Sequence, residues 1–532
     1  MQTARGIGLA GLAAALLWCA LTLPSALDQV VPAAFLRMPL EAVVLLTLLV
    51  ALPVGATRSR TALAVIAGVA LAAFSVLRLL DIGFMAALGR FFNPVVDWGN
   101  VVSGATLLLD AVGRPAGLGL LALAGLIVLA LFVAMPLAVA RIGGAAAKHR
   151  RTARRVTVAL AVIWLVLALG QVDVGGAPLA SSDASQYAYR QVTAIPQGLR
   201  DKREFADAAA RDPLHTTPSD ELLAGLRGKD VLFVFIESYG RVALEDPELS
   251  GGVRELLASE NDRLHSAGFS SRSAFLTSPT VGGISWLAHS TLQSGLWVDS
   301  KQRYDVLLDS DRLTLSHAFG RAGWRTVVDV PANTADWSRR SFYHWDQLYD
   351  SRNVGYAGPR FGYPTIPDQY TLEALHRLEL AADDRQPVMA EVDLVSSHAP
   401  WAPLPRLVPQ GEIGDGSVYS AMPQSAAPSG VAATRAAYVS SIEYSLASVF
   451  SFMEAHGDED TVLVVMGDHQ PAAVVTGTDR GRDVPITVIA KDPAVFEQIG
   501  GWGWDDGVLP SPDAPVWRMD TVRDRFLAAF HA

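Results

Sequence analysis

The chain has 532 residues, which is too long for one typical domain, and half of them are hydrophobic. Its formal net charge of −10 argues against a nucleic-acid partner. The single cysteine, Cys19, excludes an intramolecular disulfide and any metal or redox site of the Cys-x-x-Cys type.

Five long apolar runs come first. Each is close to the roughly 20 residues that a helix needs to cross a bilayer. The first run is followed by further apolar runs rather than by a soluble domain, so we expect a retained anchor instead of a cleaved signal peptide. We predict a helical transmembrane domain of about five helices over residues 1–173, in an integral membrane protein. The runs lie at about 6–26, 33–56, 60–80, 116–140 and 156–172.

Basic residues predict how these helices are oriented. They lie at Arg5, in "TRSR" at 57–60 and in "RIGGAAAKHRRTARR" at 141–155, which share one side of the membrane if the spans alternate. Lys and Arg are enriched on the cytoplasmic side of membrane proteins. The sequence therefore predicts a multi-pass protein of the cell (inner or plasma) membrane, with everything after the fifth span outside the cytoplasm.

The pattern changes after the spans. Residues 174–225, rich in Ala, Ser, Asp and Pro with helical patches, predict a linker. Over 226–532, short apolar runs alternate with helical stretches, and continuous apolar runs are typical of strands covered on both faces. This second domain is predicted to be α/β with a mostly parallel central sheet. The predicted strands are 231–237, 324–330, 387–395, 461–468 and 485–491, and the clearest helices are 285–295 and 434–456.

Three of the predicted strands end in side chains of types that commonly bind metals. Glu237 ends the first strand, His398 follows the third, and Asp468 and His469 end the fourth in "TVLVVMGDHQP". Ligands gather at the carboxyl ends of parallel strands, and two buried carboxylates repel unless a cation separates them. A mixture of oxygen and nitrogen ligands suits Mn²⁺, Zn²⁺ or Mg²⁺. Each residue alone could be a cap or half of an ion pair, but the set favours a divalent ion.

The stretch "SPTVGGISWLAHSTLQSGL" at 278–296 offers a nucleophile. Thr280 is expected at or just before a helix N-terminus, where backbone N–H groups stabilise phosphate. A hydroxyl beside a divalent cation can lose its proton and attack phosphorus. Ser278 is an alternative nucleophile, and either residue could instead be a simple cap. His289 lies on the helix and is expected to be structural.

The order of these motifs resembles a known family. A Glu at a strand end, a Thr 43 positions later, a Trp-x-Arg, a Ser-His-x-Pro and a Gly-Asp-His follow one another. This order is similar to that of the lipoteichoic acid synthase and phosphoethanolamine transferase branch of the alkaline phosphatase/sulfatase superfamily. The resemblance implies about five membrane helices, a linker and an external sulfatase-like (alkaline phosphatase-like) domain.

The resemblance also implies roles for single residues. It makes Thr280 both the nucleophile and a ligand of one divalent ion, with Mn²⁺ expected first and Zn²⁺ or Mg²⁺ as alternatives. Trp337 and Arg339 resemble residues that contact a phosphoglycerol headgroup, and His398 resembles the histidine near the transferred phosphate. The other implied ligands are Glu237, Asp468 and His469.

The implied activity is a headgroup transfer. A phospholipid would donate phosphoglycerol or phosphoethanolamine to an envelope polymer, glycolipid or glycan through a phospho-threonine intermediate. A phosphodiesterase or sulfuric ester hydrolase would use the same site with water as acceptor, and a non-catalytic binding protein is a third reading. Sulfate-ester hydrolysis through formylglycine is disfavoured, because "SPTVG" lacks the arginine of the required motif.

Overall fold

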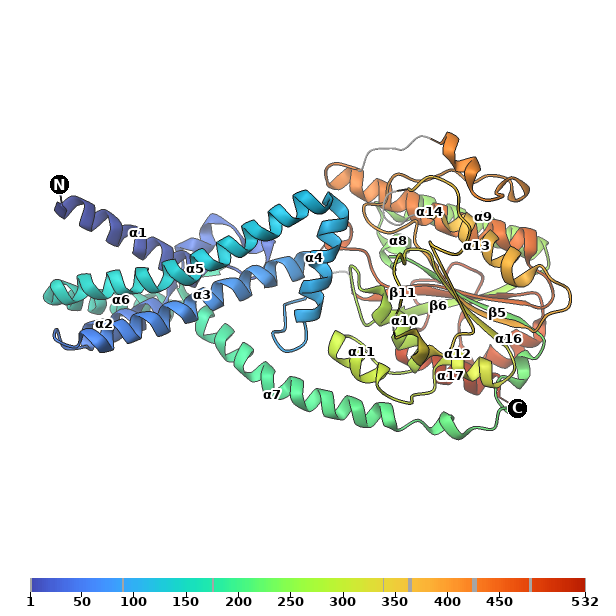
Figure 1. Cartoon of the computed structure of the whole chain (residues 1–532), viewed down its shortest axis with the longest axis horizontal. Coiled ribbons are helices and arrows are strands. Elements are labelled where there is room, and N and C mark those ends of the chain that lie inside the picture. Colours follow the sequence, from blue (N-terminus) through green and yellow to red (C-terminus); the bar gives the residue numbers. More distant parts are fainter. Residues whose placement is uncertain are drawn as a thin grey trace. The chain divides into compact units, whose positions relative to one another are not determined.

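The structure is a computed structural model that describes residues 2–88, 90–174, 177–337, 339–361, 366–422, 428–477 and 481–531 (Figure 1). The chain divides into two compact units. The first, residues 1–86 and 90–201, is mostly helical, and the second, residues 87–89 and 202–532, contains a large sheet. The predicted division into three parts at 173 and 225 stays a prediction.

The first unit contains the five apolar helices that the sequence predicts. In the described part of the chain, three are long and apolar enough to cross a membrane, whereas Gly8–Thr22 and Leu40–Ala51 are shorter apolar helices. The second predicted span is shortened because Pro39 and Pro53 bracket it, and proline disfavours helix at the residue before it. The helices are α1 (Gln2–Thr22), α2 (Leu40–Ala51), α3 (Thr57–Leu88), α5 (Arg114–Lys148) and α6 (Arg150–Leu169).

One long helix, α7 (Asp183–Ala210), fills much of the segment expected to be a linker. Its first turn is held to the start of α2: Arg37 Nη1 lies 2.6 Å from Asp183 Oδ2, and the backbone N–H of Ser185 donates to Glu41 Oε1 over 2.6 Å. The helical patches that the sequence indicates are therefore parts of one continuous element.

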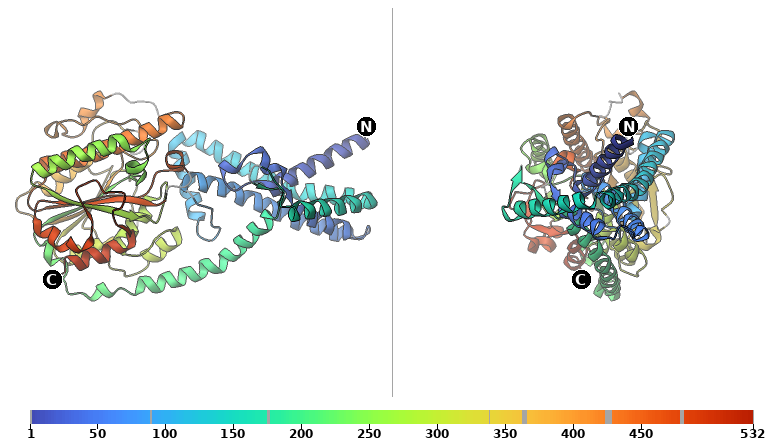
Figure 2. Two further views of the ribbon diagram at one scale, coloured as in Figure 1. Left: turned by 180° about the vertical axis from the view of Figure 1, so that it is seen from behind. Right: turned by 90° about the vertical axis from the view of Figure 1, so that its left-hand side faces the viewer.

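The second unit is built on one sheet (Figure 2). Among the described residues it has nine strands, in the order β12-β6-β11-β10-β5-β9-β7-β8, with β13 also paired to β6. The run from β10 to β8 is parallel, and β11 lies antiparallel between β10 and β6. The bounds are β5 (Asp230–Ile236), β6 (Ser270–Thr277), β7 (Arg325–Val330), β8 (Gln347–Asp350), β9 (Val388–Leu394), β10 (Thr461–Gly467), β11 (Asp483–Ala490), β12 (Asp505–Asp506) and β13 (Val516–Arg518).

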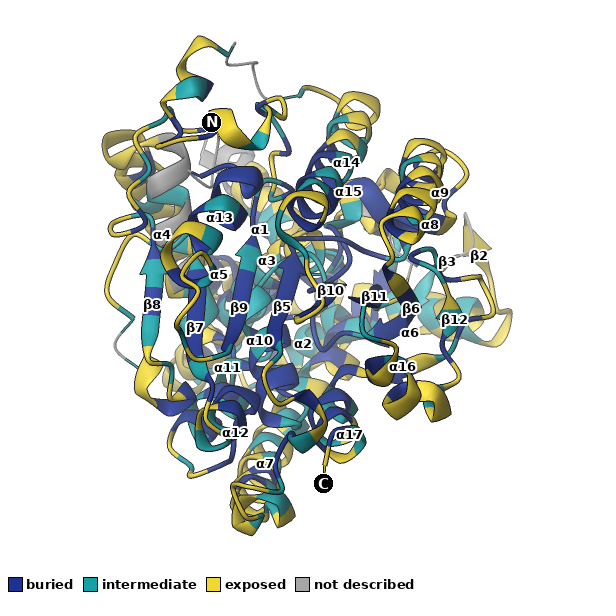
Figure 3. Cartoon of the chain, turned by 90° about the vertical axis from the view of Figure 1, so that its right-hand side faces the viewer, coloured by how far each residue is buried: buried dark blue, intermediate teal, exposed yellow. Residues whose placement is uncertain are grey.

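Helices cover both faces of this sheet (Figure 3). One face packs against α9 (Ser250–Ser266) and α14 (Val431–His456), with α13 (Asp368–Leu375) beside them, and the other against α10 (Ser285–Ser294), α12 (Leu315–Arg321) and α17 (Val522–Ala529). Every residue of β5 and β10 is buried, which explains their continuous apolar sequences. The predicted fold class, apolar helices plus an α/β domain with a mostly parallel sheet, is confirmed.

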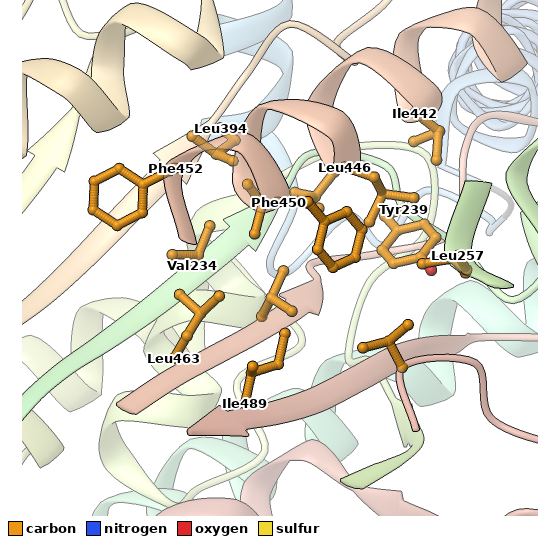
Figure 4. Close-up of a cluster of buried hydrophobic side chains, with 14 of the residues drawn as sticks. Val234, Tyr239, Leu257, Leu394, Ile442, Leu446, Phe450, Phe452, Leu463 and Ile489 are labelled. Carbon is orange, nitrogen blue, oxygen red and sulfur yellow. The ribbon is translucent and has the colours of Figure 1, made fainter. Parts of the chain in front are cut away.

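Alternate residues of the strands enter two separate cores. Figure 4 shows the core on the α14 side, where strand residues meet the apolar face of that helix. Burying each such side chain contributes about 1.5–3 kcal/mol. The two cores hold the strand ends rigidly and therefore fix the positions of the residues that follow each strand. The labelled residues are Val234, Tyr239, Leu257, Leu394, Ile442, Leu446, Phe450, Phe452, Leu463 and Ile489.

Candidate metal centre

Neighbouring parallel strands bring together three of the predicted ligands. Ile236 pairs with Gly467, so Glu237 after β5 and Asp468 after β10 leave the sheet at the same edge. The ligand atoms of Glu237, Asp468 and His469 all lie within 4.8 Å of one another. All three side chains are buried.

The backbone and nearby side chains fix the position of Asp468. Its Oδ1 accepts hydrogen bonds from the backbone N–H groups of Ser238 and His469, both over 2.7 Å. Ser238 has a φ of 58°, so a left-handed residue aims that N–H at the carboxylate. The Tyr438 hydroxyl of α14 donates to the Ser238 carbonyl over 3.0 Å and secures the same turn. The second oxygen of Asp468 is thereby directed toward His469.

The imidazole of His469 has its two nitrogens in different surroundings. Nδ1 lies 2.9 Å from the carbonyl oxygen of Gln470, which can only accept, so Nδ1 carries a proton. Nε2 faces Glu237 Oε1 at 3.2 Å and Asp468 Oδ2 at 3.5 Å. A bare lone pair on Nε2 would repel both carboxylates. Either a second proton or a cation must therefore lie between them.

These spacings fit a divalent cation. Ligand atoms that each lie about 2.1 Å from one ion are about 3.0–3.5 Å from each other. The observed separations of 3.2 and 3.5 Å fall in that range. Two carboxylates and one imidazole with its far nitrogen bonded to a carbonyl are a donor set that suits Mn²⁺, Zn²⁺ or Mg²⁺.

The charges in the cluster shift all three pKa values. Burial raises the pKa of Asp468 to about 7, and the charge of Glu237 adds to this. Burial acts to lower the pKa of His469, but the charges of Asp468 and Glu237 outweigh it and raise that pKa to about 9. Burial acts to raise the pKa of Glu237, but the His469 charge and hydrogen bond bring it well below its usual range. An incoming cation must therefore displace a proton at neutral pH.

Thr280 and Ser278 lie in the turn between β6 and α10. The Thr280 hydroxyl donates to the carbonyl of Gly283 over 2.7 Å, and the Ser278 hydroxyl donates to the carbonyl of Asp468 over 2.6 Å. An isolated bridge between Val281 and Gln470 attaches this turn to the end of β10. Both hydroxyls therefore lie in a turn next to the cluster, but each is hydrogen-bonded to a backbone oxygen.

A different hydroxyl contacts both the carboxylate and the imidazole. Ser285 Oγ donates to Glu237 Oε2 over 2.8 Å and lies 3.3 Å from His469 Nε2. Ser285 is the first residue of α10 and follows Ile284, which has a φ of 64°. Sequence reasoning missed Ser285, although its place directly before an apolar helical pattern is a typical helix-start signal.

Trp337 packs in a hydrophobic cluster around α10. Its ring centre lies 5.5 Å from that of Tyr343 and 5.4 Å from that of Trp345, and the same cluster includes Ile284 and Trp286. Trp337 therefore supports the segment that carries Ser285.

Arg339 and His398 lie in different settings. Arg339 forms ion pairs with Asp309 and, at 3.8 Å, with Asp305, and it lines a cavity of about 540 Å³. His398 is partly exposed after β9, and its charge acts to lower the pKa of Glu237. Among the predicted substrate residues, His398 has an electrostatic effect on a residue of the cluster.

Comparisons with solved structures find similarity at low sequence identity. The lipooligosaccharide phosphoethanolamine transferase A of Neisseria meningitidis, an integral membrane protein, is 15% identical over 97% of this chain and 95% of that chain, with a TM-score of 0.44. The lipoteichoic acid synthase LtaP of Listeria monocytogenes is 15% identical over 54% of this chain and 71% of that chain, with a TM-score of 0.36.

A third solved structure contains a metal. The periplasmic domain of EcEptC from Escherichia coli, in a complex with Zn, is 15% identical over 51% of this chain and 74% of that chain, with a TM-score of 0.34. No protein-family model and no curated protein matches the chain. Because all three TM-scores lie below 0.5, we base the function of the chain on its own residues.

Proposed function

We propose that the chain is a membrane-anchored, metal-dependent transferase that moves a phospholipid headgroup phosphate to an envelope acceptor. The observation that carries this proposal is the convergence of Glu237, Asp468 and His469 with the hydroxyl of Ser285 at one edge of the sheet. The order of the sequence motifs supports the same reaction, with phosphoglycerol or phosphoethanolamine as the group transferred. The acceptor is an envelope polymer, a glycolipid or a glycan.

Glu237, Asp468 and His469 hold one divalent cation in this proposal, with Mn²⁺ expected first and Zn²⁺ or Mg²⁺ as alternatives. When bound, the cation supplies positive charge that lowers the pKa of a neighbouring hydroxyl and stabilises phosphoryl oxygens. Asp468 is held by two backbone N–H groups and His469 by a carbonyl, so both ligands are oriented before the ion arrives.

The protein supplies the nucleophile from the start of α10. The motif resemblance assigns this role to Thr280, whereas the contacts with Glu237 and His469 favour Ser285. The serine oxygen attacks phosphorus while its proton passes to Glu237, the bond from phosphorus to the diacylglycerol oxygen breaks, and that oxygen takes up the proton and leaves as diacylglycerol. The N-terminal end of a helix favours anions, which suits a phosphoryl group held at the start of α10.

The second half of the reaction reverses the first. An acceptor hydroxyl attacks the phosphorus of the headgroup phosphoserine, its proton passes to the protein, and the serine oxygen leaves and is protonated again. His398 lies close enough to the cluster for its charge to lower the pKa of Glu237, which supports a role near the transferred phosphate. Water in place of the acceptor would make the same site a phosphodiesterase.

Mass spectrometry can test this proposal directly. Purified full-length protein is loaded with Mn²⁺, incubated with vesicles of phosphatidylglycerol or phosphatidylethanolamine, and digested. We expect a headgroup phosphate on the peptide that contains Thr280 and Ser285, and fragmentation identifies the modified residue. Glu237→Gln and Asp468→Asn should not form the adduct. A protein that binds the metal but never carries the adduct would contradict the proposed mechanism.

The proposal includes the side of the membrane on which the second unit lies. The predicted orientation places the second unit outside the cytoplasm, where donor headgroups of the outer leaflet are available. Anchoring to the same membrane raises the local concentration of donor at the site.

A further inference from the structure

A second group of ligand-type side chains lies between α10 and the sheet. Glu391 and Asp393 are alternate residues of β9, so they share one face, and His289 lies on α10 one turn after Ser285. His289 Nδ1 is 3.0 Å from Glu391 Oε1 and 3.2 Å from Asp393 Oδ1. The ligand atoms of these three residues all lie within 4.8 Å of one another.

Neighbouring groups hold this cluster in place. The ring of Phe235 stacks on His289 with centres 4.0 Å apart and planes 25° apart. Gln293 Oε1 accepts from the backbone N–H of Ser316 over 2.9 Å, which turns the Gln293 Nε2 toward Glu391 Oε2, 2.5 Å away. Glu391 is therefore an oriented acceptor, in the way that residues behind a metal site orient its ligands.

The cluster lacks the charge that would balance it. One proton on Nδ1 of His289 can be given to only one of the two carboxylates at a time. Asp393 Oδ1 lies near His289 Nδ1, but the atom is buried and makes no hydrogen bond in the described part of the chain. No Lys or Arg side chain of the described residues pairs with Glu391 or Asp393. One imidazole lies against two carboxylates, of which Glu391 is buried and Asp393 is partly buried, and a cation would balance the remaining negative charge.

We propose that His289, Glu391 and Asp393 bind a second divalent cation beside the one assigned to Glu237, Asp468 and His469. Each cluster consists of one imidazole and two carboxylates, and in each the nitrogen-to-oxygen distances of 3.0–3.5 Å fit ligands of a single ion. Ser285 touches the first cluster and His289 belongs to the second. Four residues of helix separate them by about 6 Å, so both ions lie close to the proposed phosphate.

This inference deepens the proposed function and rests on it for the first ion. A pair of cations can stabilise both the attacking and the leaving oxygen of a phosphoryl transfer. The measurement, however, counts ions and does not depend on which reaction the protein performs.

The test is the number of Mn²⁺ ions per purified full-length chain, by elemental mass spectrometry after gel filtration. All proteins carry His456→Ala, because Glu373, His376 and His456 form another group with ligand atoms within 4.8 Å. We expect two ions per chain, and one ion in each of Glu391→Gln and Glu237→Gln. Glu260→Gln is the matched control, since Glu260 is a buried glutamate of α9 outside both clusters, and it should keep two ions.

Electron paramagnetic resonance gives a second readout that needs no variant. Two Mn²⁺ ions one helical turn apart should show spin–spin splitting in the wild-type protein. A count of one ion, or two ions that Glu391→Gln leaves unchanged, would overturn the proposal and identify His289 as an imidazolium between two carboxylates. If two ions bind but no headgroup adduct forms, the proposed function fails and the second site stands. If an adduct forms on a protein that holds one ion, the second site fails and the proposed function stands.

Discussion

The hydroxyls of Ser285 and Thr280 differ in what they contact, and this decides the first prediction. Ser285 Oγ reaches Glu237 and His469, whereas Thr280 Oγ1 is bonded to the carbonyl of Gly283. We predict that Ser285→Ala reduces headgroup transfer by a factor on the order of 10³ or more, as loss of a nucleophile does. Thr280→Ala should retain measurable transfer. The reaction is followed with labelled phosphatidylglycerol.

If Thr280→Ala lost more transfer activity than Ser285→Ala, the nucleophile would be Thr280, as the motif resemblance implies. Thermal unfolding of both variants provides the control, because a variant that unfolds early would lose activity for another reason.

His317 makes the stability of the second unit depend on pH. Burial lowers its pKa to about 4, and the charges of His344, Arg321 and His215 add to this. The unfolded chain, with an ordinary pKa near 6.5, therefore binds more protons between pH 4 and 6.5. Stability is present above pH 6.5 and is lost as the pH falls toward 4, with a slope of at most about 1.4 kcal/mol per pH unit.

Chemical unfolding of the detergent-solubilised chain at several pH values measures this slope. His317→Gln should flatten it between pH 6.5 and 4. An unchanged slope in that variant would assign the pH dependence to other groups.

The buried carboxylate of Asp212 predicts a large loss of stability. Its Oδ2 lies 2.8 Å from Arg523 Nη1 and 3.1 Å from Arg312 Nε, and all three side chains are almost fully buried. Asp212→Asn would leave the buried guanidinium of Arg312 without its counterion and that of Arg523 with Asp524 alone, which costs about 3–5 kcal/mol. Asp520→Asn, which breaks a more exposed pair with Arg518, should cost less than about 1 kcal/mol. Equal losses in the two variants would contradict this assignment.

At the scale of elements, the last residue of β10 connects the sheet to the site. A Cβ on Gly467 would lie 1.9 Å from the carbonyl oxygen of Tyr239, so only glycine lets β10 and the turn after β5 approach this closely. We predict that Gly467→Ala displaces Asp468 and weakens Mn²⁺ binding at least tenfold, measured by calorimetric titration. Gly501→Ala, where a Cβ meets no atom within 4 Å, should bind as the wild type does.

Strand ends were the elements that the sequence predicted well. Apolar runs identify β5, β9 and β10, and parallel strands present their carboxyl ends at one edge whatever their order. The sequence therefore predicted that Glu237, Asp468 and His469 lie together. It did not predict that β11 is antiparallel, because the apolar pattern of a buried strand is the same in either direction.

The turn before α10 shows why the nucleophile was harder to predict. Strand β6 was not predicted, since its sequence "SSRSAFLT" mixes polar residues into the apolar run. Gly282 and Gly283 then adopt φ values of 73° and 147°, which redirects the chain between Thr280 and Ser285. The sequence shows that glycine permits such a turn, but the direction depends on the bridge between Val281 and Gln470.

The second cluster illustrates another limit of pattern reading. Glu391 and Asp393 lie inside an apolar run that predicts a buried strand, and His289 was expected to be structural. Their meeting depends on which helix packs over β9, and no local pattern in the sequence encodes that pairing.

At the scale of the whole molecule, the orientation in the membrane can be tested. The basic segments at 57–60 and 141–155 predict a cytoplasmic side, and the second unit should lie on the other side. We predict that protease added to intact spheroplasts cuts within the second unit, while the segment at 141–155 is cut only after the membrane is permeabilised. Protection of the second unit in intact spheroplasts would refute the proposed location.

The strand order β10-β5-β9 has a consequence for biosynthesis. Glu237 is made long before Asp468 and His469, yet β5 is central and needs β10 as its neighbour. A nascent chain that stops short of β10 lacks the central neighbour of β5 as well as Asp468 and His469. Under the proposed function, such a chain could not hold the ion and would not act on the lipids around it.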